Sequence, residues 1–92
     1  MPFRYKRGIC ASYARQIYIY GVSLNYKNLS TAQQRKIREL CEKAGGEHGE
    51  ALLEFVTTDA TATAVCMKHY IASRTTLYNA VKAYYENFPL KI

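Results

Sequence analysis

The sequence predicts an all-α protein, a compact small helical bundle formed by a single domain of 92 residues. Two observations carry this prediction. Ser30 and Gln33 have the spacing of a capping box, in which each side chain bonds the backbone of the other at the start of a helix. Near the C-terminus, apolar side chains recur at the spacing of one buried helical stripe; they are Leu77, Val81, Tyr84 and Phe88.

Residues 1–29 are expected to form a basic N-terminal arm and a helix. Apolar residues recur at helical spacing within residues 9–20, although Gln16 to Tyr20 is also rich in residues that favour strands. We expect a helix that ends near Gly21, followed by a loop over residues 22–29.

Residues 30–57 are expected to form the helical core. The helix that follows Ser30 should end at Ala44-Gly45-Gly46, because glycine readily takes the left-handed conformation of a helix C-terminus. A second helix is expected from about Glu47 to Val56. Its strongly apolar composition predicts that it is the central element of the core.

Residues 58–92 have the spacing of a helix-turn-helix. Asp59 is a good N-cap for a helix over residues 60–69, which Tyr70-Ile71-Ala72 should interrupt. Ser73 then caps a second helix, from Arg74 to about Asn87. A short helix, a turn and a capped helix that opens with hydroxyl and basic residues are typical of DNA-binding proteins. The alternative is an ordinary helical hairpin of a bundle.

The net charge of +6 is unevenly distributed. Residues 1–38 contain no acid, and their eight basic residues are Arg4, Lys6, Arg7, Arg15, Lys27, Arg35, Lys36 and Arg38. Such a surface attracts phosphate, and tyrosines are interleaved with it, so we favour contact with nucleic acid over solvation of helix faces. Arg4, Lys6 and Arg7 are predicted to grip the DNA backbone.

Other classes of function have little support in the sequence. Cys10, Cys41 and Cys66 are expected to be free thiols, and although Cys66 and His69 could both face a metal, no familiar zinc spacing exists. His48 and His69 lack an obvious acid partner, and no glycine-rich phosphate loop is present. We therefore expect no metal, no cofactor and no enzymatic activity.

Targeting signals are not evident either. No apolar run approaches the ~20 residues of a membrane span, and no apolar core follows the basic N-terminus as in a secretory signal. We expect a cytoplasmic protein without a membrane partner.

Residues 58–88 resemble the helix-turn-helix segments of small DNA-binding proteins of bacterial prophages and mobile elements, including transposase-like and sigma-region-4-like segments. The resemblance is carried by residues 65–78, Val-Cys-Met-Lys-His-Tyr-Ile-Ala-Ser-Arg-Thr-Thr-Leu-Tyr. Two departures stand out. Tyr70 and Ile71 occupy the turn where the family usually has glycine, and Ala72 separates Ile71 from Ser73. Either the turn is one residue longer, or the first helix is shifted by one.

The resemblance implies a sequence-specific DNA-binding protein, most simply a small transcriptional regulator. The residues implied to contact DNA are Ser73, Arg74, Thr75, Thr76, Tyr78, Asn79, Lys82 and, on the preceding helix, Lys68. Arg74 would bind guanine and Asn79 adenine, as these side chains commonly do in the major groove. Thr76 and Lys82 would contact backbone phosphate, and Ser73 would cap the recognition helix.

Double-stranded DNA is thus the expected partner, bound by a homodimer at paired half-sites, although no heptad pattern assigns the dimer interface. One rival is a protein-binding module or inhibitor that docks a basic helical surface on an acidic or nucleic-acid-handling protein. Another is a structural packager of nucleic acid or an RNA-binding protein.

Overall fold

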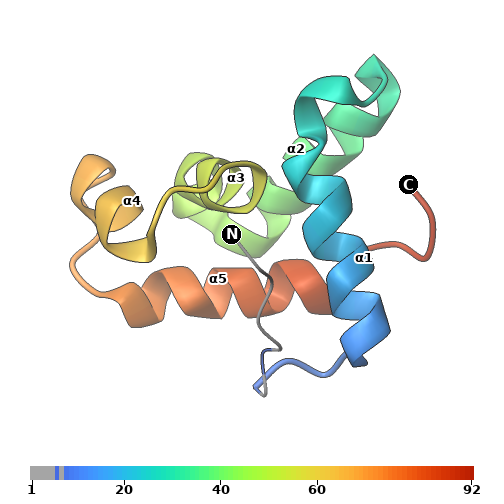
Figure 1. The fold of residues 1–92 in the computed structure, drawn as a ribbon. Coiled ribbons are helices and arrows are strands. Elements are labelled where there is room, and N and C mark those ends of the chain that lie inside the picture. The colour runs from blue at the N-terminus through green and yellow to red at the C-terminus, as the bar shows by residue number, and fades with distance from the viewer. Residues whose placement is uncertain (1–5, 7) are drawn as a thin grey trace.

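The computed structural model describes residue 6 and residues 8–92, and these contain helices but no strand. The α-helices are α1 (Tyr13–Leu24), α2 (Thr31–Gly45), α3 (Gly49–Thr57), α4 (Ala62–Lys68) and α5 (Arg74–Glu86). Two short 3-10 segments, η1 (Tyr26–Asn28) and η2 (Gly46–His48), flank α2. The prediction of an all-α bundle is confirmed (Figure 1). No helix in the described part of the chain is long and apolar enough to cross a membrane.

Helix α2 begins and ends as the sequence predicts. Ser30 Oγ accepts from the Gln33 amide at 3.2 Å, and Gln33 Oε1 accepts from the Ser30 amide at 3.0 Å, which completes the capping box. At the other end, Gly46 has φ +56° and stops the helix. Local sequence signals are sufficient here because both ends are set by residues within the first or last turn.

Helix α1 differs from its predicted bounds. It begins at Tyr13 because Ser12 Oγ accepts from the Arg15 amide at 3.2 Å. It continues through Gly21 to Leu24, so the predicted end at Gly21 and part of the predicted loop are wrong. The last turn is held by a tertiary contact. The hydroxyl groups of buried Ser23 and Tyr84 form a hydrogen bond of 2.7 Å. The free energy of this buried bond offsets the modest cost of a glycine inside the helix.

The predicted starts of α3 and α4 also need correction. Helix α3 begins at Gly49, because residues 46–48 form η2 first. A Cβ on Gly49 would lie 3.2 Å from the Glu42 Cα, so glycine permits the close approach of α3 to α2. Helix α4 is capped by Thr61, whose Oγ1 accepts from the Ala64 amide at 3.1 Å, and not by Asp59. This later start places Ala62 and Val65 in the core.

Helix α5 runs along one side of the molecule (Figure 1) and packs against α2, α3 and α4. The predicted buried stripe is confirmed, since each of its members is buried: Leu77, Val81, Tyr84 and Phe88. Leu52 of α3, Ile37 of α2 and Ile19 of α1 fill the same core. The opposite face of α5 is therefore held rigidly toward solvent.

Candidate nucleic-acid interface

The connection between α4 and α5 is a long turn with a left-handed residue. The Ile71 amide donates to the Cys66 carbonyl at 2.8 Å, and the Tyr70 amide donates to the Met67 carbonyl at 3.5 Å. These two bonds form a Schellman motif, which requires the intervening residue to be left-handed. Tyr70 has φ +57°, alone among the described non-glycine residues. Buried Ile71 then fixes the chain against the core.

The structure gives the bounds of this connection. Helix α4 ends at Lys68, and residues 69–73 form the connection before α5. Tyr70 has the left-handed conformation that glycine favours, and Ile71 and Ala72 follow it before the Ser73 cap. The predicted N-cap is confirmed, because Ser73 Oγ accepts from the Thr75 amide at 3.2 Å.

The outer face of α5 exposes every residue on that helix that the sequence predicted to contact DNA. These exposed residues are Arg74, Thr75, Thr76, Tyr78, Asn79 and Lys82. The Arg74 guanidinium makes no hydrogen bond or ion pair with any residue that the structure describes. The first acid on α5 is Glu86, its last residue. The start of α5 therefore presents a basic and hydroxyl-rich surface.

Two predicted phosphate ligands are engaged in ion pairs. Lys82 Nζ lies 3.9 Å from Glu86 Oε2, a long and exposed pair that stabilises little. Lys68 Nζ lies 3.0 Å from Glu54 Oε1, and His69 Nε2 lies 3.1 Å from the same oxygen. The hydrogen bonds to His69 and then to Lys68 hold the pKa of Glu54 below its usual value. The expectation that His69 has no acid partner is wrong, because Glu54 of α3 contacts it.

Large apolar side chains are exposed beside these polar groups, and sequence reasoning did not select two of them. Met67 is 74% exposed, Tyr70 is 95% exposed, and Tyr78 is 50% exposed. Between α4 and the start of α5 lies a hollow of about 430 Å³, lined by Thr63, Cys66, Met67, Ile71, Ala72 and Arg74. The sequence feature that could have pointed to these exposed residues is Tyr70, an aromatic residue at a turn position that favours glycine.

Two described basic residues of the N-terminal region, Lys6 and Arg15, are held against other parts of the fold. Lys6 bonds through its backbone to the Gln16 side chain at 2.9 and 3.1 Å, and its ammonium lies 5.9 Å from the centre of the Tyr85 ring. Burial lowers the pKa of the Lys6 ammonium. This half-buried position differs from the predicted role of Lys6 in a DNA-gripping arm. The other two predicted arm residues, Arg4 and Arg7, lie outside the described residues.

Arg15 is likewise used within the fold. Its guanidinium donates to the Phe88 carbonyl at 2.9 Å and to the Leu90 carbonyl at 3.2 Å, and it also reaches the Pro89 carbonyl. These bonds fasten the segment after α5 to α1. Arg15 is thus a structural residue rather than part of a surface for phosphate.

Four exposed basic residues remain on η1 and the first half of α2: Lys27, Arg35, Lys36 and Arg38. Arg38 donates to Tyr26 Oη at 2.9 Å, and Lys36 donates to the Ile92 carbonyl at 3.5 Å. We name these four residues the η1–α2 basic surface. Its residues lie on η1 and α2, and none of them lies on α4 or α5.

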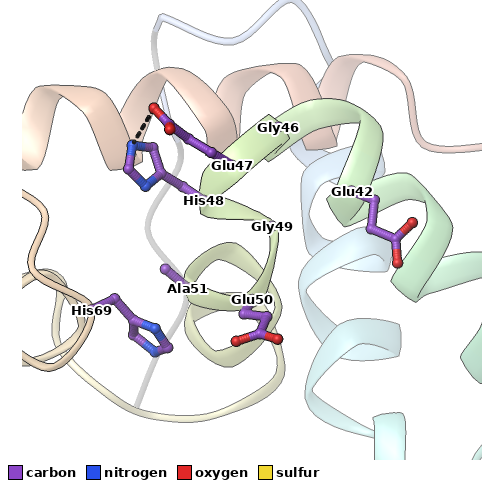
Figure 2. A pocket seen from close by; sticks show the side chains of 8 residues that line it. All are labelled: Glu42, Gly46, Glu47, His48, Gly49, Glu50, Ala51 and His69. Carbon is purple, nitrogen blue, oxygen red and sulfur yellow. Dashed lines mark ion pairs between the residues drawn. The ribbon is translucent and has the colours of Figure 1, made fainter.

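A second hollow, of about 320 Å³, lies where α2, η2 and α3 meet, with His69 on its rim. Its acidic side chains Glu42, Glu47 and Glu50 point in different directions (Figure 2). His48 Nε2 lies 3.6 Å from Glu47 Oε1. In the described part of the chain, no three His, Cys, Asp or Glu side chains are placed to hold a metal ion.

No protein-family model, curated protein or solved structure matches this chain.

Proposed function

We propose that this protein binds double-stranded DNA sequence-specifically through α5, as a small transcriptional regulator of a phage or mobile element. The observation that carries the proposal is the outer face of α5, which starts at the Ser73 cap and presents no acid before Glu86. The residues on this face match the groups that read and position DNA.

The dimensions and the support of α5 suit a recognition helix. Its 13 residues extend about 20 Å, and an α-helix fits the major groove of B-DNA. Its buried side is anchored through Leu77 and Tyr84 in the core, so the exposed side chains are carried by a rigid backbone. Rigid placement of the contacting groups lowers the entropic cost of binding.

Each exposed residue of α5 has a role in this proposal. Arg74 is exposed and without a partner in the described part of the chain, so it is free to bind guanine through two hydrogen bonds. Asn79 follows on the same face and would bind adenine. Lys82 would exchange its weak pair with Glu86 for a phosphate, and Thr76 would bond the backbone.

The η1–α2 basic surface has a different role. Because its residues lie on η1 and α2 and not on α5, it would attract the polyanion at long range rather than read bases. Its contribution should be independent of sequence and sensitive to salt.

The experiment is a titration of fluorescent random-sequence duplex with purified protein across about 50 to 200 mM salt, followed by selection of a preferred site. Arg74→Ala should weaken binding to the preferred site by about 1–3 kcal/mol and relax specificity. Arg35→Ala is the matched control, because Arg35 is an exposed arginine of α2. It should weaken preferred and random DNA alike. Absence of binding at the lowest salt would refute the proposal.

A second candidate function, docking on a protein, is favoured by one observation. Met67, Tyr70 and Tyr78 are exposed around the start of α5, and methionine and tyrosine are enriched at protein interfaces. Tight binding to one protein that Tyr70→Ser abolishes, with no salt-dependent affinity for DNA, would support this function.

A further inference from the structure

One carboxylate oxygen, Oε1 of Glu54 on α3, is shared by two side chains at the end of α4. Lys68 Nζ lies 3.0 Å from this oxygen, and His69 Nε2 donates to it at 3.1 Å, since an ionised carboxylate only accepts. The side chain of Lys68 is 66% exposed, whereas those of Glu54 and His69 are 26% and 22% exposed. Lys68 is therefore the partner that can leave Glu54, and His69 is the partner that stays.

This cluster lies beside the outer face of α5. Phe55 follows Glu54 in α3 and packs edge-on against Tyr78 of that face, with ring centres 6.4 Å apart. Lys68 is the last residue of α4, and α5 begins at Arg74 after one connection. A phosphate of DNA bound along α5 therefore competes with Glu54 for the Lys68 ammonium.

Loss of Lys68 changes the electrostatic surroundings of His69. While Lys68 is bound, its ammonium neutralises the Glu54 carboxylate and repels a positive charge on the neighbouring imidazole. Once Lys68 has turned to a phosphate, Glu54 is left with His69 alone, and opposite charges at this distance favour the imidazolium. The added proton goes to Nδ1 of His69, because Nε2 already donates to Glu54.

His69 is the member of the cluster whose charge can change near neutral pH. The hydrogen bonds to His69 and Lys68 hold the pKa of Glu54 below its usual value, so Glu54 stays ionised. An imidazole is the side chain that ordinarily changes charge between about pH 5 and pH 8. Among the described residues, the charged or titratable groups around His69 are Glu50 and Glu54 of α3, Glu42 of α2, Glu47 and His48 of η2, and Lys68 of α4; those that line the hollow are drawn in Figure 2. Carboxylates outnumber cations in this set, so their combined field favours a positive charge on His69.

We propose that DNA binding at α5 takes up a proton at His69, because Lys68 passes from Glu54 to a phosphate and leaves the carboxylate to the imidazole. This inference rests on the proposed function and adds pH as a regulator of the same site. A complex that holds one more proton than its separate components is favoured as pH falls. The protein therefore binds DNA more tightly on the acid side of neutrality.

The test is a titration of fluorescent random-sequence duplex with the full chain at about 50 mM salt, between about pH 6 and about pH 8. The affinity of the wild type should be about fivefold higher at the lower pH, a fraction of the change that one full proton would give. His69→Gln should bind with nearly the same affinity at both ends. His48→Gln is the matched control, because His48 is the other histidine of the chain and pairs with Glu47. It should keep the pH dependence of the wild type.

Glu54→Gln tests the other half of the exchange. It removes the charge that competes for Lys68, so DNA affinity should exceed that of the wild type at the higher pH and should depend little on pH. Glu39→Gln removes the same charge from the exposed surface of α2 and should keep the wild-type pH dependence. Equal pH dependence in the wild type and His69→Gln would overturn this inference and leave the proposed function standing. Absence of DNA binding at every pH would remove the proposed function, and this inference with it.

Discussion

Replacing Tyr70 by glycine should stabilise the protein, although it removes an aromatic side chain. Tyr70 has φ +57°, and a left-handed conformation costs a residue with a Cβ about 1–2 kcal/mol. The side chain is 95% exposed, so its removal forfeits almost no buried area. The amide bonds from Tyr70 to Met67 and from Ile71 to Cys66 belong to the backbone and remain.

The net gain is smaller than the relief of strain. Glycine gives the unfolded chain more freedom, which costs about 0.4–1 kcal/mol. The difference is a gain of about 0.5–1 kcal/mol in the free energy of unfolding, or a rise in Tm of about 4 °C for a domain of this size.

Urea and thermal unfolding followed by far-UV circular dichroism measure this change. Tyr70→Ala is the control, because alanine removes the ring but keeps the Cβ and so should not raise stability. The reasoning is refuted if Tyr70→Gly is less stable than the wild type, or if Tyr70→Ala gains as much as Tyr70→Gly. A stabilised Tyr70→Gly that has lost affinity for the ligand would identify the ring as a binding group.

Three further predictions concern the core and the helix contacts. Ser23→Ala should lower the free energy of unfolding by about 1–3 kcal/mol, because it leaves the buried Tyr84 hydroxyl unpaired. Tyr84→Phe should lower it by only about 1 kcal/mol, because Ser23 keeps its 2.7 Å bond to the Ile19 carbonyl; the urea midpoints of the two variants measure the difference. Gly49→Ala should lower the free energy of unfolding by about 1–3 kcal/mol, because the added methyl group pushes α3 away from Glu42 of α2. An unchanged Tm would contradict the close approach of these two helices. The pKa of Glu54 is lowered in the folded state, so its stabilising contribution is present above the unfolded value of about 4.3 and is lost as pH falls through the lower folded value. Glu54→Gln should therefore flatten the acid side of a stability–pH curve, and a curve of wild-type slope would refute the pairing with His69 and Lys68.

The helices with local end signals could be predicted from the sequence. The capping box of α2 and the Ser73 cap of α5 are each formed by residues within one turn, and the periodic stripe of α5 determines which side is buried. For the same reason, exposure of Arg74 and Asn79 could be predicted from helical phase.

What could not be predicted depends on contacts between distant residues. Asp59 and Thr61 are both acceptable caps, and the start of α4 is decided by which choice buries Ala62 and Val65. The internal role of Arg15 depends on carbonyls more than 70 residues away, which no local pattern reveals. Gly21 is likewise a residue type that often ends a helix, yet α1 continues past it because Ser23 forms a hydrogen bond with Tyr84.

The contacts of α1 with the end of α5 have a consequence during protein synthesis. Ser23 bonds to Tyr84, the Cys10 amide donates to the Glu86 carboxylate at 2.8 Å, and Arg15 donates to the Phe88 carbonyl. None of these bonds can form before residues 84–88 have been synthesised. These contacts close nearly the full length of the chain, and contacts so distant in sequence form slowly. While the ribosome is still adding the middle of the protein, α1 has none of these late contacts. Helix α1 can pack on α3 before then, but the side of α1 that Tyr84 and Phe88 cover stays exposed until the last residues of the domain have been added.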